Sequence, residues 1–389
     1  MANLGAIRAS VGPGVRIEPV VKADAYGHGA IPVARSLEAA GADGFGVATF
    51  DEALALRRAG VRRPILVLYP VPADFAGEAA RRGIALTVGD ARLLERLLQA
   101  LLAGTVPRRR LRLQLEVETG LGRGGFAPAN VGAAVGAIRA VPAARLEGAW
   151  SHLAAPGDGR RTGAQTGRFE EAMGVLTEGG VRLPLRHLTG SGGLLVATPD
   201  YDAVRPGLVT YGILPDGLEP AAARIGLARR LRPVMALRAR PVRVVDLPAG
   251  WGVSYGPSFE TRRPSRIATL PLGYGDGWSR ALSNRAEALV RGVRVPLVGT
   301  VAMDAVMADV TDVPGRPVGV DDEFTLLGEQ GGDRIDVAEL ARSRATISWE
   351  IVTAMSARLP RVYHAAAGPL GIRTLLGGAD RWRESRPPR

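Results

Sequence analysis

The most informative residue of this chain is a solitary lysine. Of the 50 lysines and arginines among 389 residues, only Lys22 is a lysine. Arginine replaces lysine in most surface roles, but its guanidinium stays protonated and cannot serve as an amine nucleophile. Formation of a Schiff base with a carbonyl group requires a primary amine whose pKa burial can lower. The composition therefore makes Lys22 a candidate for covalent catalysis, and chance survival is the alternative interpretation.

Two further features are suited to chemistry, although each has an ordinary structural explanation. The turn Gly190-Ser191-Gly192-Gly193 offers backbone N–H groups and a hydroxyl that suit an anion, but most glycine-rich turns are plain loops. His152 follows an apolar run in a chain that has four histidines. A lone histidine is more often a packing residue than a catalytic one, so neither feature decides a function by itself.

The first part of the chain alternates short apolar runs with helical patterns, from residue 15 to about residue 212. Helices are predicted at Asp51–Ala59, Ala91–Leu102 and Thr166–Thr177. Eight strands are predicted, at Arg16–Lys22, Gly44–Ala48, Ile65–Tyr69, Ala85–Val88, Leu111–Val117, Leu146–His152, Arg186–Thr189 and Ala203–Val209. Eight β/α units in about 200 residues favour a closed (β/α)8 TIM-type barrel. An open dinucleotide-binding sheet is less favoured, because no G-x-G-x-x-G motif opens the first helix.

The pattern changes after about residue 225, where β-like segments follow one another with short turns such as Arg291-Gly292. These segments are Val234–Val245, Arg266–Leu272, Ala288–Leu297, Ala305–Val310 and Glu323–Leu327, with one clear helix at Asp336–Arg342. The sequence thus predicts an α/β barrel over residues 1–222 and a mostly β domain over residues 223–372. Residues 373–389 are predicted to be a disordered tail.

The composition also excludes several classes of protein. The chain has no cysteine, which rules out disulfides and thiolate metal sites, and we predict no metal. No apolar run approaches the roughly 18 residues of a membrane span, and the first residues lack the features of a signal peptide, so we expect a cytoplasmic protein without membrane contact. The net charge is +12, but apart from Arg108-Arg109-Arg110 the arginines are scattered and aromatic residues are only 5 %, which argues against nucleic-acid binding.

The segment from Val20 to Gly29, VVKADAYGHG, closely resembles the cofactor-attachment motif of alanine racemases. The resemblance extends over nearly the whole chain, through further motifs in the order that the family has them. It implies a pyridoxal 5'-phosphate (PLP) enzyme that interconverts L- and D-alanine, with Lys22 as the lysine that carries the cofactor. It also implies a homodimer with shared active sites and a small amino-acid substrate. The D-alanine would serve peptidoglycan precursor synthesis or catabolism, which the sequence does not separate.

The same resemblance implies which residues hold the cofactor. Tyr26 and Ser191 match positions whose hydroxyls contact the phosphate, and Gly207 and Leu208 match positions that donate backbone N–H groups to it. Arg205 matches the arginine that faces the pyridine nitrogen. Arginine can only donate a hydrogen bond there, so the nitrogen stays unprotonated and the ring is a weaker electron sink. We interpret this choice as a limit on side reactions; in isolation an ion-paired arginine would be the ordinary explanation.

Racemisation requires a base on each face of the substrate, and the resemblance assigns both. Lys22 would serve one face, and Tyr255 of the partner chain, in Gly252-Val253-Ser254-Tyr255-Gly256, would serve the other. A tyrosine with an ordinary pKa near 10 is a poor base unless its neighbours lower that value. His152 matches the histidine that pairs with this tyrosine in the family, so we expect it to lie in the site.

Arg123 and the backbone N–H of Met303 match the groups that bind the substrate carboxylate. Two positions depart from many relatives. Glu116 stands where they carry a carbamylated lysine that holds the substrate-binding arginine, and a glutamate can supply that negative charge without CO2. Ala357 stands where some relatives place a second phosphate-contacting tyrosine, so the pocket would admit side chains larger than a methyl group. Relatives usually also carry a further segment ahead of Asn3-Leu4, so we expect looser domain packing.

Several alternatives remain open from the sequence. A racemase of broader or different specificity, with serine as the nearest candidate, follows from Ala357. A PLP-binding protein without turnover would have the barrel alone, and Tyr255 and Met303 argue against it. A PLP-dependent decarboxylase shares the two-domain plan but would be expected to use a cysteine, which this chain lacks.

Overall fold

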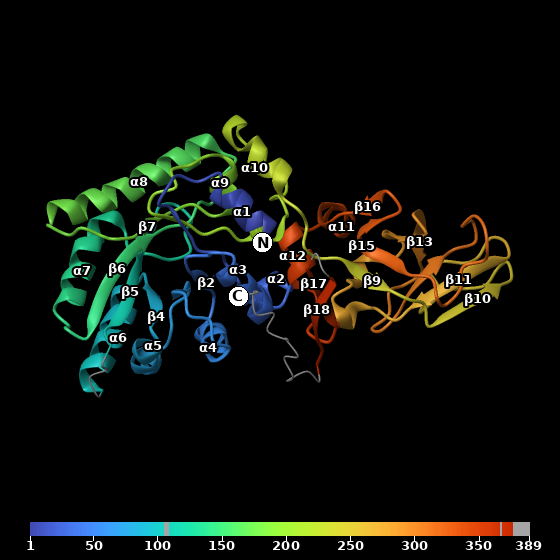
Figure 1. Cartoon of the computed structure of the whole chain (residues 1–389), viewed down its shortest axis with the longest axis horizontal. Helices are drawn as coiled ribbons and strands as arrows, with labels where there is room; N and C mark the ends of the chain where they lie inside the picture. Colours follow the sequence, from blue (N-terminus) through green and yellow to red (C-terminus); the bar gives the residue numbers. More distant parts are fainter. Residues whose placement is uncertain (105–108, 366–367, 376–389) are drawn as a thin grey trace, which may run out of the picture. The chain divides into compact units, whose positions relative to one another are not determined.

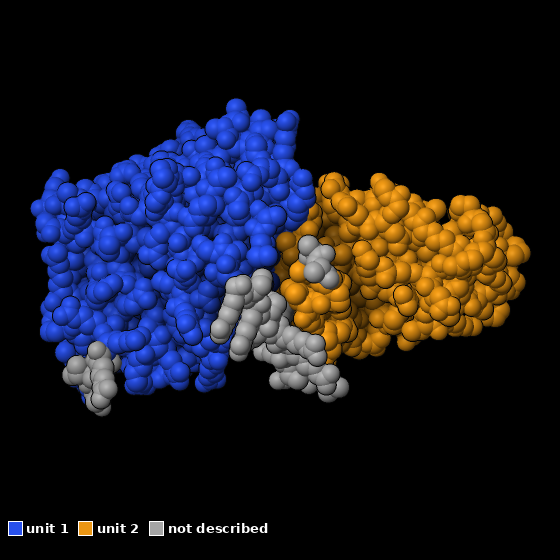
Figure 2. All heavy atoms as spheres, viewed as in Figure 1, with its two compact units in different colours: residues 1–26, 30–232 blue, residues 27–29, 233–389 orange. Residues whose placement is uncertain are grey.

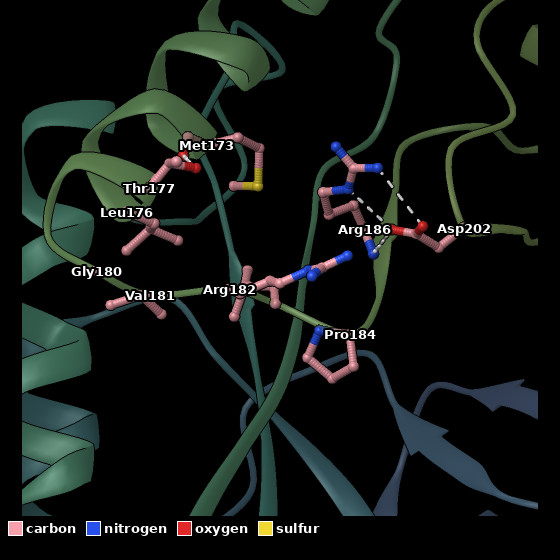
Figure 3. Close-up of a pocket in the computed structure, with 10 residues that line it drawn as sticks. Met173, Leu176, Thr177, Gly180, Val181, Arg182, Pro184, Arg186 and Asp202 are labelled. Atoms are coloured by element: carbon pink, nitrogen blue, oxygen red, sulfur yellow. Dashed lines mark hydrogen bonds and ion pairs between the residues drawn. The ribbon is translucent and has the colours of Figure 1, made fainter.

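The computed structural model describes residues 1–104, 109–365 and 368–375. Contacts divide the chain into two compact units, residues 1–26 with 30–232 and residues 27–29 with 233–389 (Figure 2). The first unit extends to Arg232, beyond the predicted boundary at residue 222. The reason is that the Asn3 side chain both donates to the Arg232 carbonyl and accepts from its N–H, each at 2.8 Å. Arg108 of the arginine cluster and residues 376–389 of the predicted tail lie outside the described residues.

The first unit is built on a ring of eight parallel strands (Figure 1). These are β1 (Arg16–Ile17), β2 (Phe45–Val47), β3 (Ile65–Val67), β4 (Ile84–Val88), β5 (Leu111–Glu116), β6 (Ala144–Trp150), β7 (Arg186–His187) and β8 (Ala203–Val204). Strands β2 to β7 form one sheet, and β1 pairs with β8. Parallel bridges between Val20 and Gly46 and between Gly190 and Arg205 join the two sheets. The ring is therefore closed, and the predicted barrel is confirmed.

Helix α1 (Ala2–Arg8) precedes the barrel strands, and the other main helices follow them. These are α3 (Ala30–Ala39), α4 (Phe50–Arg58), α5 (Ala76–Arg82), α6 (Ala91–Ala103), α7 (Val131–Arg139), α8 (Gly159–Glu178), α9 (Ser191–Leu195) and α10 (Ile225–Arg230). Helix α6 shows why they form: its buried leucines, spaced three and four apart, make one apolar face, and Asp90 caps its first N–H groups. Helix α8 begins well before the predicted Thr166, because Asp158 caps it at Gly159.

Several strands are shorter than predicted, and the two largest corrections, at β1 and β8, matter for the site. Strand β1 ends at Ile17 and strand β8 at Val204, although the sequence predicted them to continue to Lys22 and Val209. Pro19 and Pro206 follow the two ends, and each lacks the N–H for one ladder bond. Single hydrogen bonds continue beyond them, from Val20 to the Pro206 carbonyl at 2.9 Å and from Val21 to the Gly46 carbonyl at 2.8 Å, and the irregular turn begins only after these.

The second unit is mostly β, as predicted (Figure 1). Its main sheet has the order β10-β11-β14-β13-β12-β15-β16, with β9 paired to β15 and with antiparallel neighbours throughout. The strands are β9 (Leu237–Ala239), β10 (Arg243–Leu247), β11 (Ser265–Leu270), β12 (Glu287–Val290), β13 (Val293–Val298), β14 (Val306–Asp309), β15 (Phe324–Gln330) and β16 (Asp333–Ile335). A separate hairpin pairs β17 (Arg361–Ala365) with β18 (Gly368–Arg373).

Local chemistry explains the details of this unit. The single strand predicted at Val234–Val245 is two strands, β9 and β10, with Pro241 between them. Arg291 and Gly292, with φ of 53° and 78°, form the predicted turn between β12 and β13. Helix α11 (Val337–Arg344) matches the predicted helix, and α12 (Ser348–Thr353) was not predicted. No helix within the described ranges is long and apolar enough to cross a membrane.

Candidate active site

Lys22 lies just beyond β1, at the start of an unusual turn. The turn α2 (Lys22–Tyr26) has left-handed backbone, with φ between 51° and 55° at Ala23, Asp24, Ala25 and Tyr26. Left-handed helical backbone costs roughly 1–2 kcal/mol per non-glycine residue, so surrounding contacts must hold the turn. Lys22 itself is half-buried. Burial, followed by the positive charge of Arg123, lowers the pKa of Lys22, while Glu52 opposes the shift. Its amine is therefore easier to deprotonate than that of an ordinary lysine.

A small cradle lies where the left-handed turn meets the residues after β7 and β8. The Ser191 hydroxyl oxygen accepts from the N–H of Gly207 at 2.9 Å and from that of Val209 at 3.4 Å. A Cβ at Gly207 would lie 2.5 Å from the Tyr26 hydroxyl, so the close approach of this hydroxyl to the backbone requires glycine. Two hydroxyls and backbone N–H groups thus lie together, a set of groups that suits an anion. Leu208, which follows Gly207, is fully buried.

Aromatic packing holds the Tyr26 side of this cradle. The rings of Tyr26 and Tyr211 are 5.1 Å apart, and the Tyr211 hydroxyl donates to the Val20 carbonyl at 2.8 Å. Burial raises the pKa of Tyr26 to about 12, so its hydroxyl keeps its proton at neutral pH. A protonated hydroxyl can donate to an anion.

Arg205 is a buried cation of the barrel unit, only 4 % exposed. Its guanidinium donates to the carbonyls of His187, at 2.9 Å, and Ser151, at 2.6 Å, and also contacts the His187 ring nitrogen Nδ1. It lies 5.0 Å from the centre of the Trp150 ring. Burial lowers the pKa of Arg205 to about 10, and the charge of Glu18 partly opposes this. The guanidinium therefore remains a rigid, protonated donor at neutral pH.

His152 lies at the end of β6, at the mouth of the barrel, and its ring is exposed in the chain. Desolvation, followed by the positive charges of Arg205, Arg123 and Lys22, lowers the pKa of His152 well below its ordinary value. The ring is therefore neutral at physiological pH. These charges act on it because the ends of β1, β5, β6 and β8 meet at one end of the barrel, where barrel enzymes carry their sites.

Arg123 and Glu116 form an ion pair beside this mouth, with 3.3 Å between Arg123 Nη2 and Glu116 Oε1. Glu116 is the last residue of β5 and is largely buried, and burial raises its pKa against the lowering effect of Arg123. The Arg123 guanidinium also lies 5.5 Å from the centre of the Tyr69 ring. The ion pair with Glu116 thus holds one edge of the Arg123 guanidinium, and the Tyr69 ring holds its plane. Other N–H groups of the same guanidinium can bind an anion.

The second unit carries Tyr255 and Met303 on neighbouring loops. Ser254, with φ of 67°, donates its hydroxyl to the Thr300 carbonyl at 2.5 Å and so ties the Tyr255 loop to the loop after β13. Tyr255 is 75 % exposed and Met303 is 52 % exposed. Both side chains are therefore presented at a surface of this unit.

Ala357 is exposed and lies next to Arg358, whose guanidinium holds this part of the second unit together. Arg358 donates to Asp276 and to Asp304, at 2.6 Å in each case, and to the Met303 carbonyl at 3.4 Å. Ala357 thus belongs to the same surface as Met303.

The barrel unit thus brings together Lys22, Tyr26, Arg123, His152 and Arg205, with Ser191, Gly207 and Leu208 beside them. Tyr255 and Met303 share the other unit. Sequence reasoning missed three residues that shape the site: His187 beneath Arg205, Glu52 beside the left-handed turn, and Glu118. The Glu118 carboxylate accepts from three successive N–H groups, Gly120 to Gly122, ahead of Arg123. Only Glu52 had a sequence signal, the helix-capping spacing Thr49-x-x-Glu52.

Comparison with known proteins now decides the family. The model of the alanine racemase N-terminal domain matches residues 1–215, and that of the alanine racemase C-terminal domain matches residues 234–363. The chain belongs to the alanine racemase family. An alanine racemase of Symbiobacterium thermophilum is 40 % identical over 93 % of this chain and 94 % of that protein. One of Sorangium cellulosum is also 40 % identical, over 88 % of this chain and 90 % of its own length.

Solved structures of alanine racemases agree. The Bacillus anthracis enzyme with bound L-Ala-P superposes with a TM-score of 0.86 at 31 % identity, covering 96 % of this chain and 94 % of that one. The Streptomyces coelicolor enzyme superposes with a TM-score of 0.82 at 36 % identity, covering 93 % and 94 %. The predicted family is confirmed, and with it the two-domain fold and the enzyme class of isomerase.

Proposed function

We propose that this member of the alanine racemase family is a PLP-dependent racemase that interconverts L- and D-alanine. The observation that carries the proposal is the placement of the only lysine of the chain. Lys22 lies beyond the carboxyl end of β1, with a lowered pKa, and the turn that it begins leads to Tyr26 of the cradle. The buried Arg205 follows β8 at the same end of the barrel. These are the three groups that PLP requires: an amine, a phosphate site and a partner for the ring nitrogen.

The residues of the cradle fit the cofactor. The missing Cβ of Gly207 lets the Tyr26 hydroxyl lie close to the Gly207 backbone and to Ser191. Tyr26, Ser191, Gly207 and Leu208 would hold the phosphate. Arg205 would donate to the pyridine nitrogen and leave it unprotonated, since a guanidinium has no acceptor. When bound, PLP supplies an electron sink that makes the α-proton of the substrate acidic.

The two bases of the proposal lie in different units of the fold. Lys22, with its lowered pKa, would remove or deliver a proton on one face of the substrate. Tyr255 of a partner chain would serve the other face, and the neutral ring of His152 would accept its hydrogen bond. The 75 % exposure of Tyr255 supports a role at an interface between two copies. We therefore propose a homodimer in which each site draws on both chains.

Substrate recognition would rest on charge. Arg123 would bind the substrate carboxylate, together with the backbone N–H of Met303. Glu116, paired with Arg123 at 3.3 Å, supplies a fixed negative charge, so this site would need no CO2-derived group on a lysine. The exposed Ala357 leaves room at the substrate side chain, which supports serine as the alternative substrate.

The test is chiral chromatography of L-alanine and, separately, L-serine after incubation with the PLP-loaded protein. Conversion of L-alanine to a one-to-one mixture with its enantiomer is the expected result. Equal or faster conversion of serine would replace alanine by serine as the preferred substrate. If neither amino acid changed while PLP was covalently bound, the proposed racemase activity would be wrong.

A further inference from the structure

Glu52 lies in the first turn of α4, and its carboxylate accepts from three backbone N–H groups. Oxygen Oε2 accepts from Ala48 at 2.8 Å and from Thr49 at 3.1 Å, which completes a capping box at the start of the helix. Oxygen Oε1 instead accepts at 2.6 Å from the N–H of Ala23, the residue that follows Lys22. Helix capping explains the hydrogen bonds of Oε2, but it does not explain the hydrogen bond that Oε1 accepts from Ala23.

Glu52 Oε1 binds the backbone at the start of a segment with an unfavourable left-handed conformation. Ala23 begins a run of positive-φ residues that continues through Tyr26 to Gly27, and its first four residues are not glycines. Two carboxylates hold the first part of the run: Glu52 accepts from the N–H of Ala23, and Asp24, the second residue, accepts from the N–H of Ala30 at 2.8 Å. Without an acceptor at Ala23, the segment would relax toward right-handed or extended backbone, and the Cα–Cβ direction of Lys22 would change with it.

We propose that Glu52 is a positioning residue for Lys22, tying the amide after Lys22 to the end of β2 so that the amine meets the cofactor carbonyl in one orientation. This inference rests on the proposed function, because it concerns Lys22 as the cofactor carrier. Glu52 also acts on the amine electrostatically. It raises the pKa of Lys22 against burial and Arg123, and the Lys22 charge in turn helps to lower the pKa of His152.

The solitary lysine makes the test unusually clean. PLP is added to the cofactor-free protein, the adduct is trapped with borohydride, and the extent of reaction at Lys22 is read by peptide mass spectrometry over time. The variants are Glu52→Gln, which loses the charge, and Glu52→Asp, which keeps the charge but shortens the reach. Glu38→Gln is the matched control, because Glu38 also accepts two backbone N–H groups, of Arg62 and Arg63 at 2.8 Å, away from the Lys22 turn.

The attachment rate is measured at a pH where the Lys22 amine is neutral in all four proteins, so that only orientation differs. We expect both Glu52 variants to attach PLP roughly ten- to a hundredfold more slowly than the wild type, as small misplacements of reacting groups do. Glu38→Gln should match the wild type. In a 13C-methylation titration of Lys22, Glu52→Gln should move the midpoint to lower pH, whereas Glu52→Asp should keep it near the wild-type value.

Wild-type attachment rates in Glu52→Gln would overturn the inference while leaving the proposed function intact. Failure of the wild type to attach PLP at Lys22 would instead overturn the proposed function. A second measurement needs no variant: amide exchange of Ala23 in the cofactor-free wild type. Ala23 is exposed, so an unheld N–H would exchange at the rate of a free loop, and such a rate would contradict the role of Glu52. Slow exchange is the expected result.

Discussion

The two units hold their candidate site residues in opposite ways. In the barrel unit the groups are buried and hydrogen-bonded: Arg205 is 4 % exposed and donates to His187 and Ser151, and Ser191 is tied to Gly207. In the β unit the groups lie at a surface, with Tyr255 at 75 % exposure. The barrel half is thus organised within one chain, whereas the β half offers side chains that lack a covering surface. Exposed groups of this kind are typical of sites completed by another subunit.

The difference between the buried groups of the barrel unit and the exposed groups of the β unit also affects the free energy of binding. A cofactor site gains from donors that are fixed before binding, because no ordering cost is then paid on association. A base that must reach a substrate from another chain needs only a well-held loop, which Ser254 and Thr300 provide for Tyr255. The predictions below test each half separately, beginning with the largest expected effect.

Replacing Lys22 by alanine removes the group of the barrel unit that would carry the cofactor. Lys22→Ala leaves the chain without a side-chain amine, so covalent attachment of PLP and racemisation should both fall below detection. Peptide mass spectrometry after borohydride trapping and chiral chromatography measure the two losses. Racemisation by this variant at a measurable fraction of the wild-type rate would remove Lys22 from the mechanism.

Tyr255→Phe tests the β half and should leave the barrel half intact. Cofactor attachment should be unchanged, while turnover falls by about two to four orders of magnitude, the usual contribution of a general base. In D2O, one alanine enantiomer should still exchange its α-proton without inversion, because Lys22 continues to act on its face. Undiminished racemisation in both directions would show that Tyr255 is not a base.

Gly207→Ala tests whether Gly207 lies at the phosphate site of PLP. A Cβ there would lie 2.5 Å from the Tyr26 hydroxyl, so Tyr26 must move away from the position in which it would contact the phosphate. We expect affinity for PLP to fall about tenfold or more, equal to roughly 1.4 kcal/mol. Gly226→Ala is the control, since a Cβ at Gly226 meets nothing within 4 Å. Equal PLP affinities of the two variants, measured by absorbance titration, would mean that Gly207 does not border the cofactor.

Glu116→Gln should give the smallest effect. Removing the charge that holds Arg123 should raise KM for alanine by a few fold while kcat changes little, as expected for a loss of uniform substrate binding. Removing CO2 and bicarbonate from the buffer should not affect the wild type. A wild-type activity that rises with added bicarbonate would show that Glu116 does not supply the charge alone.

Sequence reasoning reached the architecture because β/α alternation is a local pattern, and it reached Lys22 because a lone lysine is visible in the composition. It misplaced the ends of β1 and β8, where Pro19 and Pro206 each remove one ladder bond, because apolar runs do not show where regular pairing ends. The left-handed backbone of Ala23 to Tyr26 has little local signal, since only Asp24 among these residues is of a type that often adopts positive φ. Contacts such as Glu52 to Ala23 and Arg205 to His187 join distant segments, and only the fold reveals them.

One measurement tests most directly whether the two halves come from different chains. Lys22→Ala and Tyr255→Phe chains, each inactive alone, are mixed, dissociated and reassembled with PLP. With random pairing, half of the dimers are mixed and each contains one intact site, so about a quarter of the wild-type activity should return. Activity no greater than that of the two parents would contradict the account, because Lys22 and Tyr255 of one chain would then have to form the site together.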